Sequence, residues 1–89
     1  MKGIVRVIGK DSIGILASIT DFLAKNKINI LEISQDVIGG YFNMTMIVDI
    51  TNVDNRFNEI IEEIEKVGQN IGLEVKIQRA DIFDAMHRI

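Results

Sequence analysis

Cysteine and proline are both missing from this 89-residue sequence. Without cysteine the chain has no disulfide and no thiolate metal site, and this composition favours a cytoplasmic location. The single histidine, His87, is not enough for a zinc site, so no metal and no cofactor are expected. No apolar run approaches the roughly 20 residues that span a bilayer. The opening stretch, residues 1–6, has too short an apolar run for a signal peptide.

Basic charge is also scarce. The net charge is -3, and the ten basic residues are scattered along the chain. Because phosphate neutralisation dominates non-specific nucleic-acid affinity, direct binding to DNA or RNA is disfavoured. No serine has a histidine within the same predicted site, and the glycine spacing matches neither the dinucleotide fingerprint nor a P-loop. The sequence therefore predicts a protein that is not an enzyme.

Apolar residues, by contrast, make up 47% of the chain, enough for the core of one domain. Alternating and β-branched stretches predict strands, whereas apolar residues three and four apart predict helices. We expect strands at residues 4–8, 28–38, 42–50 and 73–78. We expect helices at residues 12–26 and 81–89. A third helix should start within the loop of residues 51–54 and run to residue 71. The whole chain, residues 1–89, is then a single domain with a core over residues 2–80 and a tail helix over residues 81–89.

Three local features refine this prediction. The alternation slips between Ile30 and Leu31, which indicates a β-bulge. Gly39–Gly40 predicts a tight hairpin turn, because glycine adopts positive φ at little cost. Asp11 or Ser12 is the expected N-cap of the first helix, since either side chain can accept a hydrogen bond from an unpaired N–H.

The order β-α-β-β-α-β predicts an α+β, ferredoxin-like sandwich. Right-handed crossovers give an antiparallel sheet of strand order 4-1-3-2 with both helices on one face. The second strand is then an edge with unpaired backbone groups. The helix-free face would leave three isoleucines exposed unless the tail helix or another subunit covers them: Ile4, Ile8 and Ile47.

One polar corner is the candidate binding site. We expect the turn that holds Asp11, Ser12 and Gly14 to lie at the same end of the sheet as Asn29 and Ile30. A helix N-terminus favours an anion such as a carboxylate, and an aspartate can accept an ammonium group, so this corner suits an amino acid. The residues alone leave a second interpretation open, in which the polar side chains only cap the helix and a turn and the glycine only permits tight packing.

The motifs also carry a family resemblance. The run Gly9–Leu16, followed by Lys27–Ile30, resembles the ACT domain, a small regulatory module that binds amino acids, and the likeness covers about residues 2–80. The segments 29–35 and 82–86 look more narrowly like small stand-alone ACT proteins of bacteria and archaea. These are similar in turn to the ACT halves of the glycine-cleavage-system repressor and of formyltetrahydrofolate deformylase.

The resemblance implies a homodimer that pairs edge to edge into an eight-stranded sheet, with an amino acid bound at the interface. It assigns ligand binding to Asp11, Ser12, Gly14, Ile15, Asn29 and Ile30. One departure is Ile13, where many amino-acid-binding members have a proline that stiffens the loop.

The resulting hypothesis is a cytoplasmic, non-catalytic regulatory protein that binds a small amino acid at a dimer interface and signals to a partner protein. The alternative is a constitutive dimeric adaptor with no ligand. An acylphosphatase-type enzyme on the same fold is disfavoured, because the loop after the first strand carries Lys10 and Asp11 and no arginine.

Overall fold

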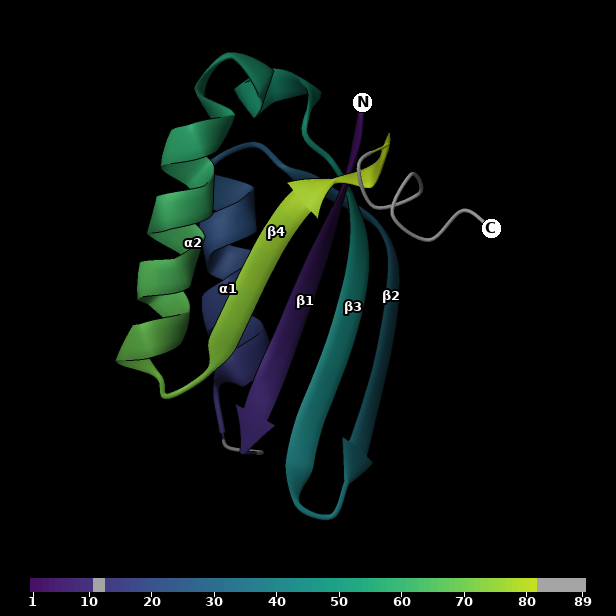
Figure 1. Cartoon of the computed structure of the whole chain (residues 1–89), viewed down its shortest axis with the longest axis vertical. Coiled ribbons are helices and arrows are strands. Elements are labelled where there is room, and N and C mark those ends of the chain that lie inside the picture. Colours follow the sequence, from purple (N-terminus) through teal and green to yellow (C-terminus); the bar gives the residue numbers. More distant parts are fainter. Residues whose placement is uncertain (11–12, 82–89) are drawn as a thin grey trace.

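The computed structural model describes residues 1–10 and 13–81 (Figure 1). Asp11, Ser12 and the predicted tail helix beyond Asp81 lie outside these ranges. The elements in chain order are β1 (Lys2–Lys10), α1 (Ile15–Lys25), β2 (Asn29–Ile38), β3 (Tyr41–Asp49), the 3-10 helix η1 (Thr51–Arg56), α2 (Phe57–Asn70) and β4 (Glu74–Arg79). The predicted α+β, ferredoxin-like order is confirmed. The start of the second predicted helix is η1, which leads directly into α2.

The four strands form one antiparallel sheet of order β2-β3-β1-β4, which is the predicted order read from the other edge. Figure 1 shows both helices on the same side of this sheet, displaced toward β4, so that β2 and its hairpin are free of helix. The predicted bulge is present, since the β2–β3 register shifts between Ile30 and Glu32. Gly39 and Gly40 both have positive φ and make the predicted turn.

The core lies between the sheet and the helices. Met44 and Met46 have no exposed surface, as expected for core filling rather than metal binding. The remaining buried strand residues on this face include Val5, Val7, Val48, Val75 and Ile77, and the helices contribute Ile15, Ile19, Leu23, Phe57, Ile60 and Ile64. Burial of this apolar surface is the main stabilising contribution to the fold.

The helix-free face is less bare than the sequence predicts. Ile8 is 40% exposed, but Ile47 is half-buried and Ile4 is only 5% exposed. The exposure expected for these isoleucines was conditional on nothing covering the face, and it is found for Ile8 but not for Ile4. Ile4 lies mid-sheet, in register with Ile47 on one side and Gln78 on the other, so long side chains flank it on both neighbouring strands.

Both helices end in the same type of turn. The N–H of Ile28 donates to the carbonyl of Leu23 (2.9 Å), and Lys27 takes φ +57° in the left-handed position that glycine prefers. At the end of α2, the N–H of Leu73 donates to the carbonyl of Gly68 (2.8 Å), and Gly72 takes φ +74°. The sequence predicts the glycine stop, whereas the lysine in the equivalent position carries no such signal.

Candidate functional site

The corner after β1 is built around a glycine conformation. Gly14 takes φ +89° at the N-cap position of α1, and a Cβ added there would meet no atom within 4 Å. The glycine therefore serves the backbone conformation and not tight packing. It also corrects the N-cap prediction, because the cap position is Gly14 and not Asp11 or Ser12, and among the described residues no side-chain hydrogen bond caps this helix.

The first turn of α1 leaves its N–H groups without intrahelical partners. The first helical bond runs from the N–H of Ser18 to the carbonyl of Gly14 (3.0 Å), so the N–H groups before Ser18 belong to the unpaired set of an ordinary helix start. No acidic side chain occupies this turn. Ile15 is buried and anchors the helix, whereas Ile13 is fully exposed and Leu16 is 41% exposed. The corner therefore combines anion-favouring donors with an exposed apolar wall.

The corner at the start of β2 has two faces. Ile30 lies in register with Val48 on the helix-covered face of the sheet and is half-buried. Asn29 is exposed and lies in register with Asp49, which shares the helix-free face with Lys2. The side chain of Ile30, and not that of Asn29, therefore belongs to the face from which α1 starts.

Asp49, beside Asn29, is held in its charged form. The hydroxyl of Thr51 donates to Oδ1 of Asp49 (2.6 Å), and the backbone N–H of Thr51 donates to the same oxygen (3.0 Å). These two bonds lower the pKa of the Asp49 carboxyl, with a smaller contribution from the Met1 ammonium 3.7 Å away. The start of β2 therefore adjoins a fixed negative charge.

The two corners do not meet within one chain. β1 and β2 are each antiparallel to β3 and are therefore parallel to one another. Lys10, which precedes the Gly14 corner, is level with Ile38 at the end of β2, whereas Asn29 is level with Lys2. About eight residue steps of roughly 3.3 Å, on the order of 26 Å, separate the two ends. The expectation that they share one end of the sheet is wrong, because the crossover helix α1 carries the chain back before β2 begins.

Sequence reasoning also missed a close approach at Gly9. A Cβ at this position would overlap the Leu73 side chain and come within 3.4 Å of the Gly72 carbonyl. Gly9 therefore brings the end of β1 against the turn before β4. A glycine within a strand is a known sign of such an approach, so this signal was available in the sequence.

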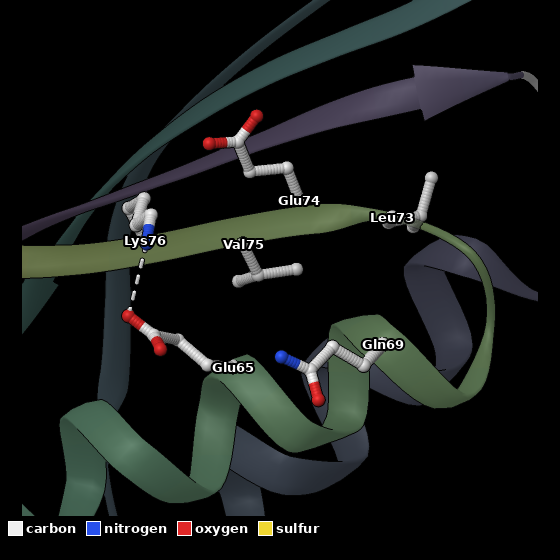
Figure 2. Close-up of a pocket in the computed structure, with 6 residues that line it drawn as sticks. All are labelled: Glu65, Gln69, Leu73, Glu74, Val75 and Lys76. Atoms are coloured by element: carbon white, nitrogen blue, oxygen red, sulfur yellow. Dashed lines mark hydrogen bonds and ion pairs between the residues drawn. The ribbon is translucent and has the colours of Figure 1, made fainter.

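Surface hollows lie elsewhere on the described part of the chain. A hollow of about 220 Å³ separates α2 from β4 and is lined by Glu65, Gln69, Leu73, Glu74, Val75 and Lys76. In Figure 2 Val75 points toward α2, Glu74 points away from it, and Lys76 Nζ lies 3.2 Å from Glu65 Oε1. Another hollow, about 310 Å³, lies between α1 and α2. Neither is lined by a predicted site residue, and the facing charges of the first are paired with each other.

The most exposed strand is β2. Every residue from 31 to 38 is exposed, including four apolar ones: Leu31, Ile33, Val37 and Ile38. Ile33 and Val37 lie in register with Met46 and Phe42 and so belong to the face that carries the helices. A strand of ten residues whose outer edge pairs with no described strand, and whose apolar side chains are exposed, is a surface for pairing with another strand.

The ACT-domain family profile matches residues 3–78 of this chain. The chain belongs to the ACT-domain family. This ACT domain is 44% identical over 88 residues to a UPF0237 protein of Bifidobacterium longum, with 99% of this chain and 98% of that protein covered. It superposes on an ACT domain protein from Streptococcus pneumoniae with a TM-score of 0.84, 37% identity and 94% of both chains covered.

Two more distant structures share the fold of this ACT domain. A glycine cleavage system transcriptional repressor has a TM-score of 0.73 and 18% identity over 88% of this chain and 44% of its own. A formyltetrahydrofolate deformylase from Burkholderia mallei has a TM-score of 0.76 and 12% identity over 88% of this chain and 28% of its own. Both resemblances expected from the sequence are confirmed at the level of fold.

Family membership confirms the coarse functional prediction, since ACT domains are regulatory, ligand-binding modules. Within residues 1–10 and 13–81, no helix is long and apolar enough to cross a membrane. The same described residues contain no group of three side chains arranged to hold a metal ion.

Proposed function

We propose that this ACT domain is a non-catalytic regulator in the cytoplasm that binds a small amino acid at the interface of a homodimer and acts on a partner protein. The observation that carries the proposal is the bare β2 edge of a domain from a regulatory, ligand-binding family. Pairing along β2 covers the unpaired edge and the exposed Ile33 and Val37 together.

In a two-fold dimer, the Gly14 corner of one copy can lie beside the start of β2 of the other copy. Paired copies of β2 run antiparallel, so the start of β2 in one copy lies beside the end of β2 in the other. The end of β2 is also the end of the sheet that bears Gly14. Gly14 of one copy and Ile30 of the other then face the same niche, which a single chain cannot form.

The chemistry of this niche fits an amino acid. The N–H groups before Ser18, which have no intrahelical partner, favour a carboxylate, and Asp11 is the residue that we propose accepts the ammonium group. Asn29 is retained as a ligand only through its backbone or a turned side chain, because its strand position directs it to the other face. Ile13 and Leu16 supply exposed apolar surface for a short side chain, and the buried Ile15 holds the start of the helix beneath them.

Calorimetric titration against the twenty amino acids, with light scattering in parallel, tests the proposal. Heat is expected for a small subset, and that ligand should stabilise the dimer by mass action. The double variant Asp11→Ala, Asn29→Ala should lose this heat, while the control Asp21→Ala, Asn58→Ala, which changes the same residue types on the exposed helix surfaces, should keep it. No heat with any amino acid would refute ligand binding.

The alternative is a constitutive dimeric adaptor without ligand. The observation that favours it is Ile13, whose side chain is fully exposed where a stiffening proline is common in the family. A stable dimer that gives no heat, and whose mass is unchanged by the Asp11→Ala, Asn29→Ala variant, would support the adaptor.

A further inference from the structure

We infer that two copies of this chain pair antiparallel along β2 in one specific register, with the two-fold axis at Gln35. The inference rests on the dimer of the proposed function and adds which residues of the two copies face each other. It follows from the pleat of β2, the position of its bulge and the order of its charges.

The pleat restricts the register first. A two-fold axis perpendicular to the sheet keeps the helix-covered faces of both copies on the same side. Side chains alternate between faces along a strand, so each residue must lie opposite one from the same face. Beyond the bulge, the helix-side positions of β2 are Ile33, Gln35 and Val37, and the other face carries Glu32, Ser34, Asp36 and Ile38. Because opposite residues must share a face, the two-fold axis has to lie at a residue of β2 and not between two consecutive residues.

The bulge restricts it further. The regular part of β2 runs from Glu32 to Ile38, because the register to β3 shifts just before Glu32. Gln35 is the middle of this segment, so an axis there pairs the whole of it with itself. An axis at Ile33, Ser34 or Asp36 leaves part of the segment unpaired, and the axis at Ile33 forces pairing across the bulge.

The charges of β2 disfavour the two registers nearest to the proposed one, which have the axis at Ser34 or at Asp36. An axis at Ser34 places Glu32 opposite Asp36 twice, and an axis at Asp36 places that carboxylate opposite its own copy. Like charges directly opposite each other destabilise a sheet. With the axis at Gln35, Asp36 instead lies opposite Ser34, whose hydroxyl can donate to the carboxylate, and Glu32 lies opposite Ile38.

The apolar side chains agree with the same register. Ile33 (48% exposed) and Val37 (56% exposed) lie opposite each other on the helix-side face, twice across the axis. Ile30 of one copy also comes level with the Gly39–Gly40 turn of the other, the end of the sheet at which Lys10 leads into the Gly14 corner. Each niche of the proposed function then has Val37 of one copy and Ile33 of the other beneath it.

A cysteine scan on this cysteine-free chain tests the register. Residues directly opposite in an antiparallel pair have Cα atoms about 4.5–5.5 Å apart, within the range of a disulfide, whereas residues displaced by two lie about 7–8 Å apart. Under mild oxidation, Gln35→Cys should therefore give a disulfide-linked dimer several-fold more abundant than Ile33→Cys, Ser34→Cys or Asp36→Cys alone. A mixture of the Ser34→Cys and Asp36→Cys proteins should cross-link where neither does separately.

Each other outcome overturns the register. The strongest cross-link at position 33, 34 or 36 would move the axis to that residue, and a dimer that none of the four cross-links would place the interface elsewhere. Calorimetry on the reduced Gln35→Cys protein separates this failure from that of the proposed function. Amino-acid heat from a dimer in another register, or from a monomer, overturns the axis at Gln35 and leaves ligand binding standing.

Discussion

The two edge strands of the sheet, β4 and β2, have opposite surroundings. β4 alternates buried and exposed residues and packs on α2, where Gly68 allows Val75 to approach so closely that a Cβ at Gly68 would lie 2.5 Å from Val75 Cγ2. Two ion pairs further along β4 join it to the helical segment, Lys76 to Glu65 of α2 and Arg79 to Asp54 of η1. β2 is longer, exposes every residue beyond the bulge and, over most of its length, has neither of the described helices α1 and α2 beside it.

This difference shows that a single chain buries the apolar side chains of β4 but not those of β2. The backbone of β4 is an edge, but its apolar side chains are already buried by α2. On β2 the same alternation of apolar and polar residues continues without anything in the described chain to cover the apolar ones. In the proposed dimer a second copy covers these side chains.

The largest expected effect comes from truncating the same residue type on each edge. Ile77→Ala on β4, where Ile77 is 5% exposed, should destabilise the fold by about 2–5 kcal/mol through lost burial and a residual cavity. Ile33→Ala on β2 should change the free energy of unfolding of the single chain by no more than about 0.5 kcal/mol. Urea denaturation at low protein concentration measures both.

Ile33→Ala has a second expected consequence, a weaker dimer. Equal losses of stability in the two variants at a concentration where the chain is monomeric would contradict the comparison, because they would mean that β2 is packed within one chain.

A smaller effect on stability is expected at Lys27, in the turn that connects α1 to β2. Lys27 holds φ +57°, and its carbonyl accepts a hydrogen bond from Asn52 Nδ2 (3.1 Å). Lys27→Gly keeps this backbone contact and relieves the left-handed strain, so it should stabilise the fold by about 0.5–1 kcal/mol. Thermal unfolding measures the gain. The control Lys25→Gly, at the last residue of α1, should destabilise by up to about 1 kcal/mol, because glycine disfavours the helix and the ion pair with Asp21 is lost. A loss in both variants would show that Lys27 is not strained.

The smallest effect concerns Asp49, beside the start of β2. Its pKa is lowered first by the hydroxyl of Thr51, so the charged form contributes stability at neutral pH that is lost as the pH falls through the lowered pKa. Thr51→Val removes that hydrogen bond and should raise the pKa of Asp49, which moves the loss to higher pH. NMR titration of the Asp49 carboxyl follows it, and an unchanged midpoint would show that the Thr51 hydroxyl does not set this pKa.

The fold could be predicted because its signals are local and repeated. The alternation of β3, the Gly39–Gly40 turn and the slip at Ile30 each leave a pattern in neighbouring residues, and each is present in the structure. The position of α1 was clear from its apolar stripe. Its N-cap was not, because Gly14 supplies a conformation where the sequence offered two better-known capping side chains nearby.

The site was harder because it depends on contacts between distant segments. The residue types at positions 14 and 29 were read separately, and the direction of β2 relative to β1 puts them at opposite ends of one chain. No pattern in neighbouring residues indicates that the two corners could come together only across a two-fold axis. The sequence likewise shows a glycine at position 9, but it does not show that Leu73 packs against it.

The mass of the protein in solution tests the central claim, that β2 is an edge meant for a second copy. Light scattering of the wild-type chain should give the mass of two chains. Val37→Asp, which puts a charge into the proposed apolar contact, should give the mass of one chain at the same concentration, while Gln69→Glu, the same charge change on exposed α2, should remain a dimer. A wild-type protein with the mass of a single chain, or a Val37→Asp variant that stays paired, would contradict the account.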